Sequence, residues 1–449
     1  MKTMKLLLFA GAMLLGASLS ASETLFKGGK SGYVIAISAQ ASESEKTAAV
    51  DLQQYIEKVG GATLPIVEYV PRGKYISICY NNLVAENLGA AFPYDEDESF
   101  HCKSKDGNVY IYGGRERGTM YGVYSFIEKY LGVRWLTPEC TIIPQKRTFS
   151  FEDLDYSESP ALKYRYVQYH NASRDDAWMA RNKNNSTWTA AQNKYGGIES
   201  YWNAHTSGQF ITTKDYFSQH PEYFSFRDGK RVPDSQLCLS NPEVLKICIE
   251  KMKKAIADNP LYWVYSMSQN DNFLPCQCEN CLALEKKYGG HSGIFIWFVN
   301  QVADAIKDVY PDKYIGTFAY QYTRQAPKNI VPRPNVVIRL CSIECDFSHP
   351  INATEYNKPF MKDLEDWSRI APQLFIWDYV VNFNQYLAPY PNFGSLAQNI
   401  ITFRDHKAVG VQEEAQYQTD GGEFSEMKAW VLAKLLWNPE QDTQALVDE

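Results

Sequence analysis

The sequence predicts an α/β protein in two parts, a small α/β sandwich followed by a (β/α)8 (TIM) barrel. Strands and helices alternate along the first part, and a strand–helix rhythm recurs eight times along the second. Such alternation favours parallel sheets, and eight repeats close most economically as a barrel. The chain has 449 residues, which accommodates a barrel and a smaller module.

The first 21 residues have the pattern of a cleavable signal peptide. Lys2 and Lys5 precede an apolar run over residues 6–15, and small residues follow it. A basic start, an apolar centre and a small-residue end are typical of secretion signals. No later stretch has the length of uninterrupted apolar residues that a membrane span needs. We therefore expect a secreted or periplasmic protein that does not insert into a membrane.

Composition limits the classes of partner. The net charge of −7 and the pI of about 5.7 argue against nucleic acid. Aromatic residues make up 14% of the chain, with 10 Trp and 31 Tyr, and such rings can stack on the apolar face of a sugar. The composition is compatible with a carbohydrate partner. No cofactor is expected, and the oligomeric state is not predicted.

The first part is expected over residues 22–151. Ser42 and Glu45 form a capping-box pattern, and apolar residues at helical spacing follow until Gly60 and Gly61 end the helix. A second helix with a continuous apolar face ends at Gly132. The strands expected in this part are residues 33–37, 64–69, 75–79 and 109–112. Together these elements predict a sheet covered mainly on one face.

The barrel is expected over residues 160–449. Asn241 and Pro242 have the pattern of a helix start, and Ser292 opens a second apolar helix. Further helices are expected over residues 355–370, 395–407 and 425–436. The eight expected strands are residues 164–169, 197–202, 236–239, 263–268, 314–320, 336–341, 374–379 and 408–412.

Residues 262–281 carry the pattern on which the barrel is centred. A strand with alternating aromatic residues leads into Asn270, Asp271 and Asn272, and three cysteines follow. The carboxyl end of a barrel strand and its following loop is where chemistry takes place in this fold. Asp271 is therefore a candidate catalytic residue. The alternative is that these three residues only turn the chain.

Several short motifs carry a family resemblance. ERGTMYGVY at residues 116–124 and LGVRWL at 131–136 resemble the N-terminal domain of α-glucuronidases and β-hexosaminidase-type glycosidases. Other motifs resemble a family of secreted bacterial glycosidase-like proteins labelled domain of unknown function 4838. These motifs are HPEYF at 220–224, QLCL at 236–239, SQND at 268–271, CQC at 276–278, AYQYT at 319–323 and LCSIECDF at 340–347.

The resemblance implies an α/β module followed by a catalytic-type barrel that acts on carbohydrate. It supplies no substrate. The glutamate-centred acid motifs of better-known glycosidases have no direct counterpart in this sequence, so no catalytic residue is transferred from them.

The catalytic candidates therefore come from the barrel pattern. Glycoside hydrolysis generally needs one carboxylic acid that protonates the leaving oxygen and a second carboxylate across the sugar. Asp271, Glu344 and Asp378 lie at expected strand ends and are the catalytic candidates, while Glu413 and Glu414 follow the eighth strand. We expect Asp271 to be the general acid and Glu344 or Asp378 to oppose it. The alternative for each acid is an N-cap of the next helix.

Other residues near the same strand ends could contact the sugar. Aromatic side chains could line its apolar faces, and polar side chains could bind its hydroxyl groups. The alternative for a histidine is a loop or core residue that is hydrogen-bonded to the backbone. The substrate-binding candidates are His205, Asn270, Tyr320, Trp377, Tyr379 and Glu413.

Cys276, Cys278 and Cys281 place three thiols in one loop. Zinc normally takes four ligands, and these spacings lack a second regular Cys-x-x-Cys pair. In an exported protein a disulfide that braces the loop is at least as well supported. We therefore expect a structural role for the cysteines and no metal.

Two classes of function remain. The sequence favours a secreted glycoside hydrolase that cleaves a glycosidic bond with a pair of carboxylates at the carboxyl face of the barrel. The alternative is a catalytically inactive carbohydrate-binding protein on the same fold, because a fold does not determine a function.

Overall fold

The computed structural model describes residues 22–91, 93–94, 96–186, 193–198 and 201–449. The expected signal peptide, residues 1–21, lies outside the described residues. Among the described helices, none combines the length and the apolar character needed to cross a membrane.

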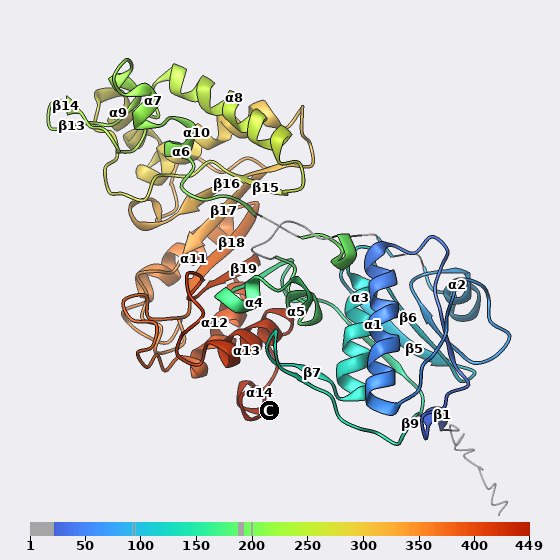
Figure 1. Ribbon diagram of the computed structural model, residues 1–449. Coiled ribbons are helices and arrows are strands. Elements are labelled where there is room, and N and C mark those ends of the chain that lie inside the picture. Colours follow the sequence, from blue (N-terminus) through green and yellow to red (C-terminus); the bar gives the residue numbers. More distant parts are fainter. Residues whose placement is uncertain (1–21, 92, 95, 187–192, 199–200) are drawn as a thin grey trace, which may run out of the picture.

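A six-stranded mixed sheet forms the N-terminal part (Figure 1). Its central strands run parallel, whereas β5 is antiparallel to β6 and β10 is antiparallel to β5. In spatial order the strands are β10 (Asp155–Glu158), β5 (Phe100–Lys105), β6 (Asn108–Gly113), β4 (Tyr75–Ile78), β2 (Val34–Ala36) and β3 (Ile66–Val67). Two short pairs lie beside this sheet, β1 (Glu23–Lys27) with β9 (Thr148–Phe151) and β7 (Arg134–Trp135) with β8 (Thr141–Ile142).

Helices α1 (Glu43–Gly60) and α3 (Gly118–Phe126) cover one face of this sheet, and α3 continues as the π-helical turn η1 (Ile127–Leu131). The capping box of Ser42 and Glu45 is confirmed, and the helix ends at Gly61 in a left-handed conformation. The predicted stop at Gly132 is also confirmed. The short α2 (Asn82–Leu88) packs on the other face.

The C-terminal part contains a curled sheet of seven parallel strands. From β12 to β19 neighbouring strands follow one another in chain order, and the first strand, β11, pairs with the last, β19. In spatial order they are β11 (Tyr164–Gln168), β19 (Ala408–Glu414), β18 (Gln373–Tyr379), β17 (Val336–Cys341), β16 (Tyr314–Ala319), β15 (Val264–Ser266) and β12 (Tyr201–Trp202).

One of the eight expected barrel strands, residues 236–239, was predicted wrongly. In the described chain this segment makes a single isolated bridge, between Leu237 and Phe224, and β12 pairs directly with β15. The backbone N–H of Gln236 donates to Leu274 O, and that of Cys238 donates to Tyr223 O. Loops beyond the barrel rim therefore take the hydrogen bonds that a neighbouring strand would have taken. Seven strands curl as in a TIM barrel, without the predicted eighth.

The helices of the C-terminal part lie around the curled sheet, and Figure 1 shows α6 to α10 gathered at one end of it. Asn241 caps α8 and Pro242 begins it, as predicted. The helices are α4 (His170–Ser173), α5 (Asp176–Arg181), α6 (Ser207–Phe210), α7 (Thr213–Tyr216), α8 (Pro242–Asp258), α9 (Glu279–Tyr288), α10 (His291–Ile306), α11 (Lys358–Ile370), α12 (Phe393–Asp405), α13 (Ser425–Trp437) and α14 (Thr443–Asp448). Short elements complete this part, namely the 3-10 turns η2 (Asn193–Tyr195), η3 (Pro221–Tyr223) and η4 (Gln321–Thr323) and the hairpin of β13 (Phe226–Arg227) and β14 (Lys230–Arg231).

The two parts share a buried junction. Trp437, at the end of α13, stacks on Phe100 of the N-terminal sheet with ring centroids 6.1 Å apart. Beside it the buried Glu98 contacts Arg117 at 2.5 Å and Arg165 at 2.7 Å. Burial alone would raise the pKa of Glu98, but the two guanidinium groups hold it below its ordinary value.

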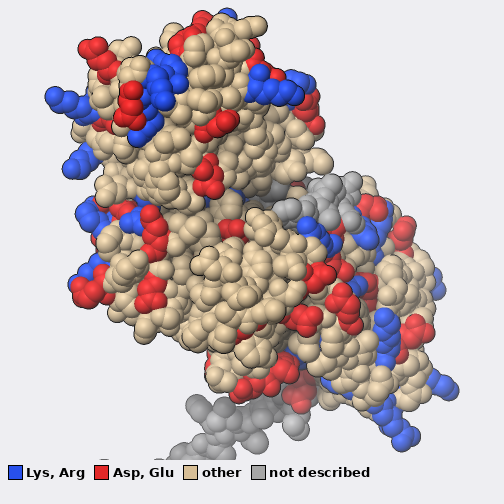
Figure 2. Space-filling view, turned by 60° about the vertical axis from the view of Figure 1, so that its left-hand side comes forward, with Lys and Arg blue, Asp and Glu red and all other residues tan. Residues whose placement is uncertain are grey.

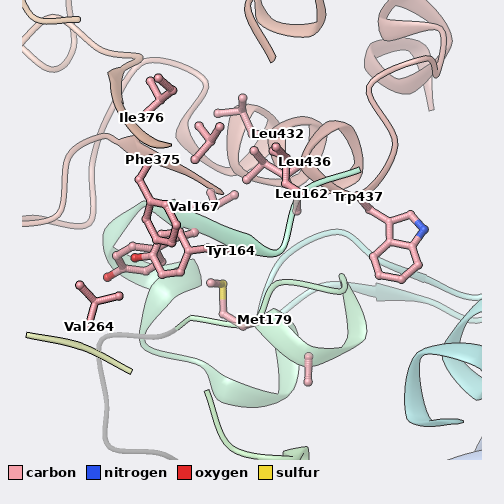
Figure 3. Close-up of a cluster of buried hydrophobic side chains, with 14 of the residues drawn as sticks. Leu162, Tyr164, Val167, Met179, Val264, Phe375, Ile376, Leu432, Leu436 and Trp437 are labelled. Carbon is pink, nitrogen blue, oxygen red and sulfur yellow. The ribbon is translucent and has the colours of Figure 1, made fainter. Parts of the chain in front are cut away.

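Buried side chains of β11, β18 and α13 form a hydrophobic cluster next to this junction. Figure 3 shows Tyr164 of β11 beside Phe375 of β18, and their rings stack with centroids 5.1 Å apart. Leu432 and Leu436 of α13 lie in the same buried cluster. These contacts anchor β11 and β18, two of the strands that carry the candidate site.

Candidate active site

A cavity of about 790 Å³ opens at the mouth of the curled sheet, and we call it the mouth cavity. Residues of β11, β17, β18 and β19 line it at two-residue spacing, because alternate side chains of a strand face the same side. Figure 2 shows a furrow in the surface between the upper and lower parts of the molecule, with acidic side chains along it. The mouth cavity lies at the carboxyl ends of parallel strands, where the active sites of TIM barrels are found.

Two carboxylates line the mouth cavity, Asp271 and Glu414. Glu414 is the last residue of β19, and Trp377 Nε1 donates to its Oε2 at 2.6 Å. Burial raises the pKa of Glu414 to about 7; the hydrogen bond from Trp377 lowers it in part, and the nearby charge of Asp271 raises it further. Glu414 can therefore hold or release a proton near neutral pH, which is what a general acid or base requires.

Asp271 is exposed in the loop after β15, where the sequence analysis placed it. Tyr320 Oη donates to Asp271 Oδ1 at 3.2 Å, and Gln321 Nε2 donates to Tyr320 Oη at 2.9 Å. Burial and the charge of Asp271 raise the pKa of Tyr320, so this phenol stays protonated and donates. Asp271 thus has a defined orientation at the edge of the cavity.

Four predicted sugar-contacting residues also line the mouth cavity, namely His205, Tyr320, Trp377 and Tyr379. The His205 Nδ1 lies 2.9 Å from Gln269 O. A carbonyl oxygen can only accept, so Nδ1 carries the hydrogen and Nε2 is the ring nitrogen available to a ligand. Phe318 packs edge-on against both His205 and Trp377, which extends the aromatic wall.

Glu344 does not line the mouth cavity. Its side chain forms an ion pair with Arg324, which also binds Asp363 of α11 at 2.7 Å. Arg324 therefore holds Glu344 toward α11, on the outer side of the sheet. The expectation that this carboxylate opposes Asp271 is not met by the geometry.

Asp378 and Glu413 are also turned away from the mouth cavity. They lie opposite each other on β18 and β19, and both are buried. Their neighbours Trp377, Tyr379 and Glu414 face the cavity, so strand alternation directs these two acids to the other face of the sheet. Burial raises the pKa of Asp378 to about 6, and burial and the charge of Asp378 raise that of Glu413 well above its ordinary value.

Asn270 braces the loop instead of lining the cavity. Its Oδ1 accepts from the backbone N–H of Gly208 at 2.6 Å, and its Nδ2 donates to Ser235 O at 2.7 Å. Both polar ends of the amide are used within the protein. Asn270 thus supports the placement of Asp271 from the neighbouring position.

Two residues of the mouth cavity were missed as site candidates, Glu414 and Arg339. Both Glu413 and Glu414 follow the eighth predicted strand, and Glu413 was the predicted sugar contact. Arg339 lies in the middle of β17, and its guanidinium stacks on Tyr201, with 3.4 Å between Cζ and the ring centroid. Arg339 is two residues before Cys341, and Glu414 pairs across the sheet with Tyr379, a predicted sugar contact. Two-residue spacing along β17 is therefore the sequence signal for Arg339, whereas Glu414 needs the register of β18 and β19.

The cysteines of the loop after β15 are not in disulfides. All ten cysteines of the chain are free thiols in the structure. The disulfide that was one alternative for Cys276, Cys278 and Cys281 is therefore not formed, and the three sulfurs lie beside Cys238, a fourth thiol that was not predicted to join them.

Solved structures of glycoside hydrolases resemble this chain. A 4-O-methyl-α-glucuronidase of family GH115, with specificity for decorated arabinogalactans, aligns with a TM-score of 0.57 and 14% identity over 93% of this chain. This chain spans only 57% of that enzyme's length. No curated protein matches the chain in sequence.

Two further glycoside hydrolases align with similar TM-scores, and the first of them belongs to family GH20. The chitobiase of Flavobacterium johnsoniae has a TM-score of 0.56 and 12% identity, over 95% of this chain and 69% of its own. The β-N-acetylhexosaminidase of Bacteroides fragilis has a TM-score of 0.53 and 11% identity, over 94% of this chain and 89% of its own. At these identities the likeness shows the fold alone.

The sequence itself identifies the family. Residues 135–449, which include the whole curled sheet and the mouth cavity, match a family described as Domain of unknown function (DUF4838). The chain therefore belongs to this family, and it has a glycosidase-like, TIM-barrel-type fold.

Proposed function

We propose that this protein hydrolyses a glycosidic bond of a carbohydrate bound in the mouth cavity. The observation that carries the proposal is that Glu414 and Asp271 line one aromatic-walled cavity at the carboxyl ends of parallel strands. Glycoside hydrolysis needs two such carboxyl groups on either side of the scissile bond. The glycosidase-like fold supports the same reading.

Glu414 is the general acid in this proposal. Its pKa of about 7 keeps a substantial protonated fraction at neutral pH, and Trp377 orients the carboxyl group. Asp271, oriented by Tyr320, is the second carboxylate, which activates a water molecule or attacks the sugar. This exchanges the role that the sequence analysis gave to Asp271 and replaces Glu344 and Asp378 as its partner.

The remaining walls of the cavity fit a sugar. Tyr379 and Phe318 offer apolar faces, and Trp377 offers an indole ring that Glu414 holds in place. His205 Nε2 is positioned to accept from a hydroxyl group. The basic and apolar start of the chain supports export, so the substrate is a carbohydrate met outside the cytoplasm.

The proposal is tested by screening the purified protein against aryl glycosides and glycan fragments. On the natural type of glycan, Glu414→Gln and Asp271→Asn should each lower turnover by about 10²–10⁴-fold, the usual contribution of a positioned acid or base. Glu344→Gln is the matched control, because this exposed glutamate lies outside the mouth cavity. An aryl glycoside with a good leaving group should lose much less activity in Glu414→Gln, since its departure needs little proton donation.

Binding of a glycan without any turnover would instead support the alternative, a catalytically inactive carbohydrate-binding protein. Full activity of Glu414→Gln on an unactivated glycan would show that the proton donor is another residue.

A further inference from the structure

Four cysteine thiols converge from two separate segments of the chain. Cys238 precedes α8, Cys276 and Cys278 lie in the loop after β15, and Cys281 lies in the first turn of α9. All four sulfurs lie within 4.8 Å of one another. Cys238 Sγ is 3.7 Å from Cys278 Sγ and 3.8 Å from Cys281 Sγ, which is far longer than the roughly 2.05 Å of a disulfide bond.

These separations match a tetrahedron of thiolates around one ion. A Zn–S bond of about 2.3 Å places the corners of a regular tetrahedron about 3.8 Å apart. We propose that Cys238, Cys276, Cys278 and Cys281 bind one Zn²⁺ ion as a structural site. Four protein ligands leave no open coordination position, so the ion braces the fold and takes no part in catalysis.

The surroundings of the sulfurs suit a charged zinc–thiolate centre. The backbone N–H of Phe226 donates to Cys276 Sγ at 3.3 Å, and Arg231 Nη1 lies 3.9 Å from the same sulfur. Ser240 Oγ lies 3.2 Å from Cys281 Sγ. Zn²⁺ with four thiolates is a dianion, and N–H and O–H groups that point at its sulfurs stabilise that charge. Figure 1 shows β13, β14 and α9 together at the end of the molecule far from the N-terminal sheet.

The proposed ion would hold the loop that carries Asp271. Gln236, two residues before Cys238, donates through Nε2 to Asn270 O at 2.8 Å and to Asn272 O at 2.9 Å. These two carbonyls flank Asp271, and Cys276 closes the same loop. Fixing Cys238 to Cys276 therefore fixes both anchors of the Asp271 loop.

Metal analysis of the full-length protein tests the site. After equilibration with Zn²⁺, elemental analysis and native mass spectrometry should find one zinc per chain, and the four thiols should resist alkylation until a chelator removes the ion. Co²⁺ in its place should give thiolate-to-cobalt charge transfer and the intense visible bands of tetrahedral cobalt. Cys238→Ser should lose the bound zinc, whereas Cys140→Ser, at an exposed cysteine outside the cluster, should keep it.

The wild-type protein alone decides the question if Cys238→Ser does not fold. No retained zinc with four freely alkylated thiols would overturn the proposal, as would a disulfide between two of these cysteines under non-reducing conditions. Iron as the bound metal would overturn the assignment to zinc. None of these measurements depends on glycosidase activity.

A second observation bears on the substrate, and it rests on the proposed function. Arg339 lines the mouth cavity, but only 3% of its surface is exposed, and its Nε and Nη2 have no hydrogen-bond partner. No described carboxylate forms an ion pair with it, and it is the one Lys or Arg among the described residues that line the cavity. A buried guanidinium without an anion is costly.

We infer that the carbohydrate carries an anionic group, a carboxylate or a sulfate, that binds near Arg339. The aromatic rings of Tyr201 and Trp377 lie 3.4 and 5.1 Å from its Cζ and hold the guanidinium plane in place. An arginine fixed in this way suits planar, charged acceptors. An anionic group on the sugar would give Arg339 Nε and Nη2 the charged acceptor that no described side chain supplies.

Binding of matched oligosaccharides separates the possibilities. Neutral, uronate-bearing and sulfated forms of one oligosaccharide are titrated against the wild-type protein, Arg339→Met and Arg339→Lys. One of the anionic forms should bind the wild type about tenfold or more tightly than the neutral form, and Arg339→Met should lose that preference. Arg339→Lys retains the charge and should keep part of it.

Equal binding of all three forms by the wild type would refute the inference about Arg339 and leave the proposed function standing. Binding of none of them by a folded wild-type protein would count against both. Circular dichroism of each variant shows whether a loss of preference reflects unfolding.

Discussion

Replacing Glu414 with glutamine should make the folded protein more stable at alkaline pH and leave its stability nearly unchanged in acid. The pKa of Glu414 is raised in the folded state from 4.5 to about 7, chiefly by burial. Between these values the folded chain binds more protons than the unfolded chain, so the free energy of unfolding falls as the pH rises through this window. Above it, the ionised carboxylate is buried at a cost that glutamine does not carry.

The magnitude follows from the size of the shift. One unit of pKa corresponds to about 1.36 kcal/mol, so a rise from 4.5 to about 7 gives Glu414→Gln an advantage of about 3 kcal/mol above that range. Glutamine keeps an oxygen that can accept from Trp377 Nε1, so the hydrogen bond is retained. Asp378 and Glu413 also titrate, but they are present in both proteins and largely cancel in the difference.

Urea unfolding at pH about 4 and about 9 measures this difference, with the free energy of unfolding obtained by linear extrapolation. Glu250→Gln, an exposed position on α8, is the matched control and should change little at either pH. A Glu414→Gln difference that is the same at both pH values would refute the reasoning, because it would show that Glu414 titrates with an ordinary pKa.

Three further changes test the packing of the fold by the same unfolding assay. Glu98→Gln leaves two buried guanidinium groups without their anion and should cost about 3–5 kcal/mol; a loss below 1 kcal/mol would mean that the junction is not held by these pairs. Gly410→Ala places a Cβ 2.5 Å from Tyr164 Cβ and should cost roughly 1–3 kcal/mol, and unchanged stability would contradict this packing. Glu413→Gln removes a buried acid whose pKa is raised by burial and by Asp378, so its stability relative to wild type should increase with pH; a decrease would show that the carboxylate is stabilised where it lies.

Much of the fold was predictable because local patterns decide it. The strand over residues 336–341 was predicted to the residue, since five of its six buried positions are apolar and three of them are β-branched. Ser42 and Glu45 likewise mark the start of α1 through contacts made within one turn. The strand predicted at residues 236–239 is not formed, because the backbone of this segment bonds to residues in other loops. A short apolar run looks the same in a barrel strand and in such a buried loop, so the sequence pattern does not separate them.

The site was predicted only in part, and the reason is also geometric. Asp271 follows its strand and reaches the cavity, but Glu413 and Glu414 are neighbours on β19, and only one of them can face inward. A strand of a parallel sheet is buried on both faces, so its hydrophobic pattern does not say which face is inner. Which of Glu413 and Glu414 faces the cavity therefore becomes clear only when the three-dimensional curvature of the sheet is known.

The missing barrel strand and the thiol cluster have one explanation. Because β12 pairs directly with β15, the chain between them is released from the sheet and forms α6, α7 and the hairpin of β13 and β14 before α8 returns to pack against β15 and α10. Gln236 and Cys238, from the segment predicted as a strand, instead hold the loop after β15 through hydrogen bonds and sulfur contacts. In a complete barrel, a neighbouring strand would support the base of that loop. Here the support comes from the segment that carries Gln236 and Cys238, which the proposed ion ties to the loop. Losing that ion should therefore disorder the Asp271 loop before it disturbs Glu414 on β19.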